Sequence, residues 1–417
     1  MKTNQTKNFQ IIRCDLLIVG GGLVGSTLAI ALGNLGLNII ILDHVAPACK
    51  IDSKDLRTTA ISYGSSNLFK ALNLWAQLEP YTQPILDICV SEYNSPAILH
   101  YTCQDVAENA PMGHMIDNGV LRHTLQNHTH VCKNIRWLAP AILKKLELTT
   151  SHIKAHLEDG REIRANLCIG ADGRNSKVRS LTDLPVTQWS YPQSALICTV
   201  THKKPHNGVA HERFLESGPF AVLPMPGNAS GIVWSCPHHQ AAHLGKLEDR
   251  EIMGCLQQEC GDTLGALTHV TPRQVYPLSV LFARRFVDKR VALIGDAAHV
   301  MHPIAGQGLN VGLRDVAALA EVIHDTHRLG LDIGNDMTLE KYQRWRRFDV
   351  LSFISMTDGL VRAFSYRSPI IRSIRRIGMR VINNTQPLKR ALTRHAMGIS
   401  GNKPKLLEAK SIKSQWH

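Results

Sequence analysis

The sequence predicts an α/β protein with a Rossmann-like domain, an inserted antiparallel sheet and a helical C-terminal region. Two glycine-rich patterns, Gly20–Gly25 and Gly295–Asn310, each follow a short apolar strand and open a helix, which predicts the first part. Alternating apolar and polar residues from about Trp189 to Phe286 predict the sheet. From about Thr338 the pattern is helical. The 417 residues are enough for two domains or one elaborated domain.

The first predicted unit is βαβ. Leu16 to Leu42 contains no charged residue and is long enough to span a bilayer. Its glycines divide it, however, into a strand (Asp15–Val19), a turn, a helix (Leu23–Leu35) and a second strand (Asn38–Leu42). A signal peptide would need a continuous apolar core and a clear cleavage site. We therefore expect no membrane span here.

The glycine pattern of this unit is typical of dinucleotide binding. Gly20 permits the tight turn, Gly22 lets a pyrophosphate approach the backbone, and Gly25 allows close packing of helix on strand. The N-terminus of the helix adds free N–H groups and a positive dipole. Asp43 ends the next strand, where an acid can bind the adenosine ribose. The alternative is a glycine-rich turn that binds nothing, and the pattern alone does not separate FAD from NAD.

Further elements follow in order. We expect a helix at about Asn67–Leu78, a strand at Ile85–Tyr93, a strand entering a helix over His114–His130, and a β-meander over Lys144–Arg164. A buried strand, Asn166–Ile169, then leads to Asp172-Gly173. In the inserted sheet we expect strands Ala195–His202, Glu212–Leu215, Phe220–Met225 and Gly231–Ser235, and one helix, Leu247–Cys260.

The second glycine-rich pattern decides between the cofactors. The strand Val291–Ile294 is followed by Gly295-Asp296 and a glycine-broken loop that opens a long helix. Two phosphate-binding patterns far apart in the chain, both at strand-to-helix junctions, indicate an extended cofactor that is held at both ends. This favours FAD over a nucleotide held at one site.

Charge and cysteines restrict the class of protein. Residues 361–417 contain 13 Lys and Arg and one acid, so the C-terminal region carries +12 of the net charge of +13. Such a region can face nucleic acid or an anionic membrane, and we favour the membrane. The ten cysteines show no CxxC and no metal spacing, which indicates reduced cytosolic thiols and no metal site.

These motifs together resemble the group A flavin-dependent aromatic monooxygenases of the para-hydroxybenzoate hydroxylase type, from about Asp15 to Arg347. The resemblance implies that Asp296 binds the ribityl chain and that Arg57 contacts the pyrophosphate. It implies that Arg122 lines the cofactor and that Asp172 supports FAD and the reduced nicotinamide. The complete predicted cofactor set is Gly20, Gly22, Gly25, Asp43, Arg57, Arg122, Asp172, Gly295, Asp296, Gly306, Gly308, Leu309 and Asn310.

Within that group the chain looks most like the ubiquinone-biosynthesis hydroxylases, on Gly306–Asp315 and Glu212–Met225, and the second stretch is closest to the 2-polyprenyl-6-methoxyphenol hydroxylase branch. One departure is Asp43, where these proteins more often carry Glu. Sister enzymes that hydroxylate other ring positions share every one of these motifs.

The resemblance implies hydroxylation of a polyprenylated phenol with NAD(P)H and O2, through a flavin C4a-hydroperoxide. Pro303, Gly306 and Gly308 would surround the flavin ring, with the helix opening near Gly308 favouring the anionic reduced flavin. Alternatives are an NAD-dependent dehydrogenase, an FAD-dependent reductase of isoprenoid lipids and a catalytically silent flavoprotein scaffold.

No acid–base residue for the phenol follows from the sequence. His299 and His302 lie near the flavin loop, but a structural role is the more common one for such histidines. Alternating apolar residues of the inserted sheet are candidates for the pocket wall, although they are more often sheet core. These candidates are Phe214, Phe220, Leu223 and Trp234.

The predicted domain boundaries follow the pattern changes. The FAD-binding parts are 11–80, 111–185 and 287–345; substrate-domain strands occupy 81–110 and the sheet 186–286; the basic helical region is 346–417. Because a polyprenyl substrate resides in the bilayer, the basic region predicts a cytoplasmic protein held peripherally at the inner membrane face or in a membrane-associated complex, without nucleic acid.

Overall fold

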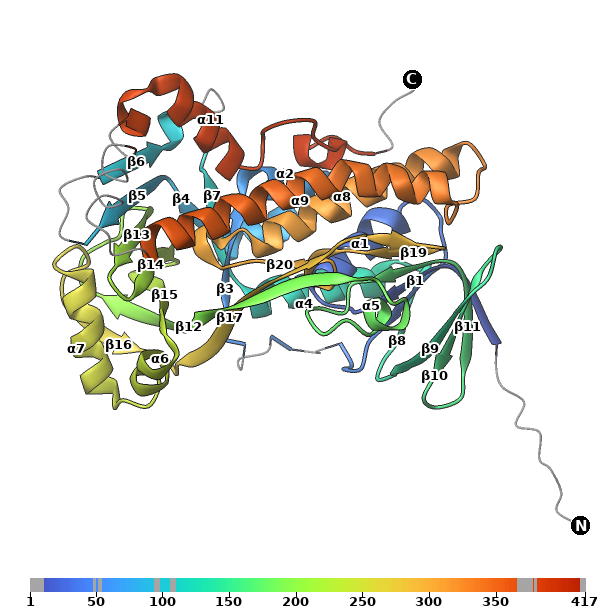
Figure 1. Cartoon of the computed structure of the whole chain (residues 1–417), viewed down its shortest axis with the longest axis horizontal. Coiled ribbons are helices and arrows are strands. Elements are labelled where there is room, and N and C mark those ends of the chain that lie inside the picture. The colour runs from blue at the N-terminus through green and yellow to red at the C-terminus, as the bar shows by residue number, and fades with distance from the viewer. Residues whose placement is uncertain are drawn as a thin grey trace, which may run out of the picture.

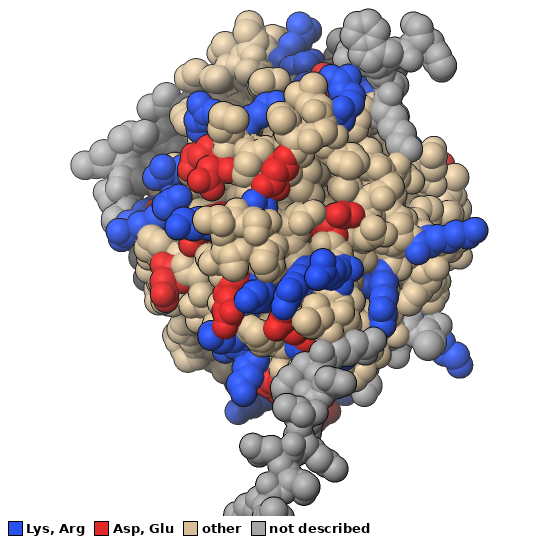
Figure 2. Space-filling model, turned by 90° about the vertical axis from the view of Figure 1, so that its right-hand side faces the viewer, with Lys and Arg blue, Asp and Glu red and all other residues tan. Residues whose placement is uncertain are grey.

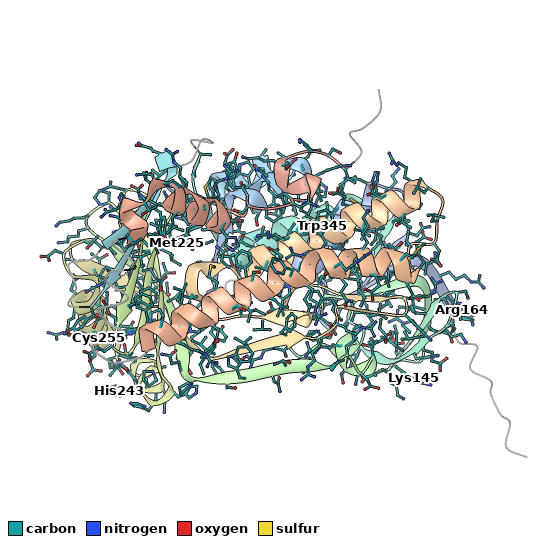
Figure 3. All side chains as sticks on the ribbon, turned by 45° about the horizontal axis from the view of Figure 1, so that its top comes forward. Lys145, Arg164, Met225, His243, Cys255 and Trp345 are labelled. Carbon is teal, nitrogen blue, oxygen red and sulfur yellow. The ribbon has the colours of Figure 1, made fainter. Side chains whose placement is uncertain are left out.

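A computed structural model describes residues 11–47, 50–51, 55–93, 98–105, 110–365, 378 and 381–412. It contains two large sheets, one at each end of the elongated molecule, with the long helices α8 and α9 running along both (Figure 1). Figure 3 places Arg164 and Lys145 at one end and Cys255 and His243 at the other. Basic and acidic side chains are interspersed on the face at the first of these ends (Figure 2).

The first sheet is the Rossmann-like one. Its strand order is β18-β19-β11-β1-β2-β8, and β1 (Ile11–Val19), β2 (Ile39–Leu42), β8 (Ile135–Leu138), β11 (Glu162–Gly170) and β19 (Val291–Leu293) are parallel where they pair. Parallel strands buried on both faces are expected to be apolar throughout, as Leu16–Val19 and Ile39–Leu42 are. Strands β9 (Leu143–Leu148), β10 (Ile153–Leu157) and β18 (Val287–Asp288) extend the sheet with antiparallel pairs.

The second sheet is the inserted one. It has the order β20-β17-β12-β15-β14-β13-β5-β6, with β16 beside β12, and it is antiparallel except where β13 pairs with β5. The bounds are β5 Asp87–Glu92, β6 Ile98–Thr102, β12 Val186–His202, β13 Val209–Leu215, β14 Gly218–Met225, β15 Ala229–Pro237, β16 Leu267–Val270, β17 Gln274–Ala283 and β20 His299–Val300. A small third sheet, β3-β7-β4 (Thr58–Ser62, Gly113–Asp117, Gln83–Ile85), lies between the two.

The helices cover these sheets. They are α1 Leu23–Gly33, α2 Tyr63–Ala71, α3 Trp75–Leu78, α4 Asn118–Val131, α5 Lys177–Leu181, α6 His238–Leu244, α7 Asp249–Cys260, α8 Gly308–Arg328, α9 Asp336–Ser365 and α11 Gln386–Ala396. Helices α6 and α7 cover the outer face of the second sheet, and α8 and α9 lie over its inner side and the first sheet (Figure 1).

Several predicted elements differ in their bounds. The helix expected over Asn67–Leu78 is two helices, because Asn73 adopts a left-handed conformation (φ 58°) that ends the first. The helix expected over Leu247–Cys260 starts at Asp249, after a capping box between Glu248 and Glu251. The meander and the strand Asn166–Ile169 share one continuous strand, β11. Helix α9 runs across the predicted boundary at residue 345.

The C-terminal region packs on the core. Gly64 N–H donates to the Met397 carbonyl at 2.8 Å, and Met397, Leu406 and Leu407 are almost completely buried. Much of the predicted basic amphipathic stretch, residues 366–377 and 379–380, lies outside the described residues. No described helix is long and apolar enough to cross a membrane.

Candidate active site

The glycines of the first loop differ in whether protein atoms fill the space where a Cβ would lie. A Cβ on Gly20 (φ 104°) would lie 2.3 Å from the Ala171 carbonyl oxygen, and one on Gly25 would lie 1.9 Å from the Gly20 carbonyl oxygen. A Cβ on Gly22 would meet no atom within 4 Å. Gly20 and Gly25 are therefore required by packing, whereas Gly22 faces open space at the N-terminus of α1.

Asp43 braces this loop. Its Oδ2 accepts a hydrogen bond from Gly21 N–H at 2.7 Å, and its Oδ1 accepts one from Val45 N–H at 2.9 Å. The carboxylate thus fixes the end of β2 to the glycine loop, and its contact with a ribose stays a prediction. No side chain of the described residues caps α1, whose first N–H groups remain available to a phosphate.

Asp296 lies at the opposite end of the predicted cofactor site, after β19. Its side chain is exposed, yet surrounding protein desolvates it enough to raise the pKa of its carboxyl, against the opposing charges of His299, Arg57 and Arg174. Both properties hold for a carboxylate on the wall of a deep recess. The charge of Asp296 also acts on Arg57, so the fold brings together two predicted site residues 239 positions apart.

Arg57 and Arg122 share one carboxylate that the sequence did not single out. Arg57 Nε donates to Asp55 Oδ1 at 2.7 Å, and Arg122 donates to Asp55 Oδ2 at 2.7 Å. Burial opposes ionisation of Asp55, but the hydrogen bonds and charge of Arg57, with Arg122, lower its pKa. Asp55 therefore holds the two arginines side by side.

A buried ionic cluster supports the Gly295-Asp296 turn from behind. Asp315 of α8 is completely buried and accepts from Gly295 N–H at 3.0 Å, from His299 Nε2 at 2.6 Å and from Arg346 Nε at 2.7 Å. Arg346 also pairs with Asp349 on α9. The sequence signal for this cluster was the charged pair Arg314-Asp315 in the largely apolar first half of α8.

The Asn310 side chain connects the start of α8 to the flavin loop and to β3. Asn310 Oδ1 accepts from Ser62 N–H at 2.9 Å, and its Nδ2 donates to the Ala60 carbonyl at 2.8 Å and to the Gly306 carbonyl at 3.2 Å. Gly306 has φ 60°, and a Cβ on it would lie 3.4 Å from that of Ala60. The Asn310 side chain thus secures the loop to β3, leaving its backbone for the predicted cofactor contact.

The N-terminus of the long helix α8 opens next to this loop. A Cβ on Gly308 would meet no atom within 4 Å, and no described side chain caps the helix. Leu309 and Pro303 are partly exposed beside it. As at Gly22, a helix terminus with unused N–H groups faces open space.

The Asp172 carboxylate accepts hydrogen bonds from residues that follow it closely in the chain. Its Oδ1 accepts from the Ser176 hydroxyl at 2.5 Å, and its Oδ2 accepts from the backbone N–H of Lys177 at 2.6 Å and of Val178 at 3.1 Å. It caps the short helix α5. Direct support of FAD or nicotinamide by this carboxylate stays a prediction.

Both loop histidines are buried. His299 is committed to Asp315, as described above. His302 accepts a hydrogen bond from Ile304 N–H at 3.2 Å, and its ring lies edge-on to Tyr191 of β12 at 5.2 Å between centroids. Burial lowers the pKa of His302 to about 4, so the ring is neutral at physiological pH. Tyr191 shows that the inner face of the second sheet reaches the flavin loop.

The predicted pocket wall divides between the two faces of the second sheet. Phe220 and Trp234 pack edge-to-face, 5.3 Å between centroids, in the apolar cluster beneath α6 and α7. They lie on the outer face and belong to the sheet core, the alternative that the sequence left open for them. Phe214 and Leu223 lie on the inner face, toward the flavin loop.

The residues fit FAD. Two uncapped helix N-termini, each beside an open glycine, suit phosphate at one end and the electron-rich flavin edge at the other, and the Asp296 carboxylate after β19 can accept from hydroxyl groups. Among the described residues, no group of three or more His, Cys, Asp or Glu could hold a metal ion.

Comparison with known proteins agrees with this geometry. The model of the FAD binding domain family matches residues 13–347. The chain belongs to this family. It is 42% identical over 385 residues to the ubiquinone hydroxylase UbiL of Rhodospirillum rubrum, covering 92% of this chain and 89% of that protein. It is 32% identical over 393 residues to the 3-demethoxyubiquinol 3-hydroxylase of Escherichia coli, covering 92% and 98%.

Solved structures agree on the fold. The p-nitrophenol 4-monooxygenase PnpA of Pseudomonas putida superposes with a TM-score of 0.77 at 17% identity, covering 95% of this chain and all of that one. The FAD-binding family member described here is thus an FAD-dependent monooxygenase, which confirms the predicted fold class, cofactor and enzyme class.

Proposed function

We propose that this monooxygenase hydroxylates the aromatic ring of a polyprenylated phenol in ubiquinone biosynthesis, with NAD(P)H and O2. The supporting observation is its similarity, over nine-tenths of the chain, to two proteins named as hydroxylases of ubiquinone or its precursors. The apolar inner face of the second sheet, which meets the flavin loop at Tyr191 and His302, suits an aromatic ring with an isoprenoid chain.

Different residues of this chain bind different parts of the cofactor. FAD, when bound, supplies the exchange of electrons with NAD(P)H and the activation of O2. The α1 N-terminus and the Asp55–Arg57–Arg122 group bind its phosphates, Asp296 accepts from its ribityl hydroxyls, and Pro303 to Asn310 orient its ring. The buried sheet face excludes water from the reacting atoms.

The reaction is tested with isotopically labelled oxygen gas. The purified enzyme with a polyprenylated phenol and NADPH should incorporate one labelled oxygen atom into the product. Label from water, or NADPH oxidation with a reduced isoprenoid chain and no oxygen consumption, would exclude this function. An Asp296→Ala variant should fold normally and purify mostly without FAD, and retained stoichiometric FAD would remove Asp296 from its assigned role.

The ring position is the finer part of the proposal. We assign the step at 2-polyprenyl-6-methoxyphenol on the Glu212–Met225 stretch, while the two relatives above carry other names. Mass spectrometry of the quinone intermediates that accumulate in a deletion strain identifies the step, because each missing hydroxyl leaves a different precursor.

We also propose contact with the inner membrane face or with a membrane-bound complex of ubiquinone biosynthesis. The C-terminal region carries +12, and the described helix α11 exposes Leu388 and Arg390 while burying Thr393. Deleting this region is not a suitable test, because Met397 and Leu407 belong to the core. A double substitution, Leu388→Gln with Arg390→Gln, should instead lower binding to phosphatidylglycerol vesicles about fivefold, since one basic residue contributes about 1 kcal/mol. Unchanged binding would exclude α11 as the contact.

A further inference from the structure

Glu212 lies on the inner face of the second sheet. Side chains alternate along β13, and its neighbour Arg213 donates to the Glu259 carbonyl of α7, on the outer side. Phe214, two residues on from Glu212, stacks on Phe364 of α9 with 3.6 Å between ring centroids. Because Glu212 and Phe214 share a face, the Glu212 carboxylate points away from α7.

The surroundings of Glu212 across the sheet are apolar. Its pairing partners on the two adjacent strands are Val90 of β5 and Ala221 of β14, and Ala221 pairs in turn with Val233 of β15. Val90 and Val233 pack against the large core cluster, as does Leu309 of the flavin loop. The carboxylate therefore stands among apolar neighbours on the inner face of the sheet.

The next row of the sheet leads directly to the flavin loop. Ala210 and Leu223 lie there and pack in one cluster with Ala60, whose Cβ would lie 3.4 Å from a Cβ on Gly306. Since Ala210 is two residues from Glu212, the two rows are separated by about 7 Å along the strand. An aromatic ring between the sheet and the flavin loop would lie within reach of Glu212.

The Glu212 carboxylate is half-buried and makes no hydrogen bond or ion pair with any residue that the structure describes. Burial alone raises its pKa to about 7. On the strands beside β13, the titratable groups on the same face as Glu212 are Glu92 of β5 and Tyr101 of β6. Near the end of α9 that meets Phe214, Asp358 and Arg362 pair with each other at 2.7 Å. A half-buried carboxylate with no partner among the described residues suits a ligand that donates a hydrogen bond.

We infer that Glu212 accepts the hydrogen bond, and then the proton, of the substrate's phenolic hydroxyl. This rests on the proposed function and supplies the base that it lacks. The phenol O–H bond breaks and a carboxyl O–H bond forms on Glu212, while the electron pair stays on the phenolic oxygen. The anionic oxygen donates into the ring and makes its carbon a stronger nucleophile toward the oxygen atom to be transferred.

The first test measures binding without NAD(P)H. The probes are 2-farnesyl-6-methoxyphenol and its O-methyl ether, which cannot donate, titrated against the FAD-loaded enzyme by flavin absorbance. The wild type should prefer the phenol at least tenfold at pH 8, where Glu212 is ionised. Glu212→Leu should lose this preference and bind both alike. Equal preference in wild type and Glu212→Leu would overturn the assignment, whether or not the enzyme hydroxylates.

The second test measures turnover. Glu212→Gln can accept a hydrogen bond but not a proton, so hydroxylation should fall about 100-fold or more while NADPH oxidation continues with release of hydrogen peroxide. The wild-type hydroxylation rate should fall below about pH 7 and that of Glu212→Gln should not. Glu216→Gln, the same change at an exposed position of the same hairpin, is the matched control and should behave as wild type.

The outcomes separate the two proposals. A wild type that hydroxylates, with Glu212→Gln equal to it in rate and pH profile, overturns the role of Glu212 alone. A wild type that never hydroxylates overturns the proposed function, and the binding preference then decides on Glu212. If Glu212→Gln does not retain FAD, Glu212→Asp replaces it. That variant should keep the pH dependence at a reduced rate, and a pH-independent rate would contradict the inference.

Discussion

Two desolvated carboxylates, Asp315 on α8 and Glu212 on β13, differ in their hydrogen-bond partners. Asp315, beneath the Gly295-Asp296 turn, has three hydrogen-bond donors at 3.0 Å or less. Glu212, in the apolar wall of the second sheet, has no described partner. Burial opposes the ionisation of both. His299 and Arg346 overcome this opposition and lower the pKa of Asp315, whereas nothing offsets it at Glu212.

This difference separates a carboxylate that supports the fold from one that can take part in a reaction. A paired buried carboxylate stays charged and holds its neighbours in place, so Asp315 can fix a turn but cannot exchange protons near neutral pH. An unpaired carboxylate away from water has a raised pKa, so it titrates nearer to neutral pH, and its ionisation costs stability. Such a cost is expected where the group serves a ligand rather than the fold.

The largest expected effect comes from breaking the paired side. Asp315→Asn should destabilise the protein by about 3–5 kcal/mol, because it leaves Arg346 buried without its main counter-ion. Chemical denaturation followed by circular dichroism measures this. Asp325→Asn is the matched control on the same helix. It breaks a more exposed pair with Lys341 at 3.3 Å and should cost less than about 1 kcal/mol. Equal losses would mean that the buried cluster does not support the turn.

The unpaired side should respond in the opposite direction. The folded-state pKa of Glu212 is raised from 4.5 to about 7, so the folded protein holds this proton more tightly than the unfolded chain does. Stability is therefore lost as pH rises from about 5 to 8. Glu212→Gln removes this penalty and should stabilise the protein at pH 8 by at most about 3 kcal/mol, with little effect at pH 5. A Gln variant less stable than wild type at pH 8 would show that Glu212 has a structural partner.

This contrast also marks what the sequence could predict. Glycine patterns at strand ends are local, so the fold class, FAD and the two ends of the site followed from them. Asp315 and Arg346 are 31 residues apart and lie on two different helices, and spacing alone does not indicate which arginine meets which carboxylate. Phe220 and Trp234 show a similar limit, because the sequence left open whether they line the pocket or form sheet core. Alternation shows that residues share a face but not which layer that face contacts.

Glu212 shows the same limit in another form. It stood within the stretch that carried the family resemblance, yet only the pairing of β13 with β5 and β14 places it opposite the flavin loop. The basic C-terminal region was likewise predicted as a peripheral attachment. The structure places Met397 and Leu407 in the core, a tertiary contact for which charge composition gives no signal.

The smallest effect concerns the open glycines on the FAD side. Gly22→Ala adds a methyl group where no protein atom lies within 4 Å, at φ −73° and ψ −166°, which alanine tolerates. Stability of the apoprotein should thus change by less than about 1 kcal/mol. FAD should bind at least tenfold more weakly, about 1.4 kcal/mol, because the methyl group occupies the approach of the pyrophosphate. Fluorescence titration of apoprotein with FAD measures this affinity.

The control is Gly254→Ala, which is equally open but lies on the surface of α7, far from the cofactor, and should leave FAD affinity unchanged. If Gly22→Ala also leaves it unchanged, the space at Gly22 does not receive the cofactor, and the FAD side would be built for packing alone.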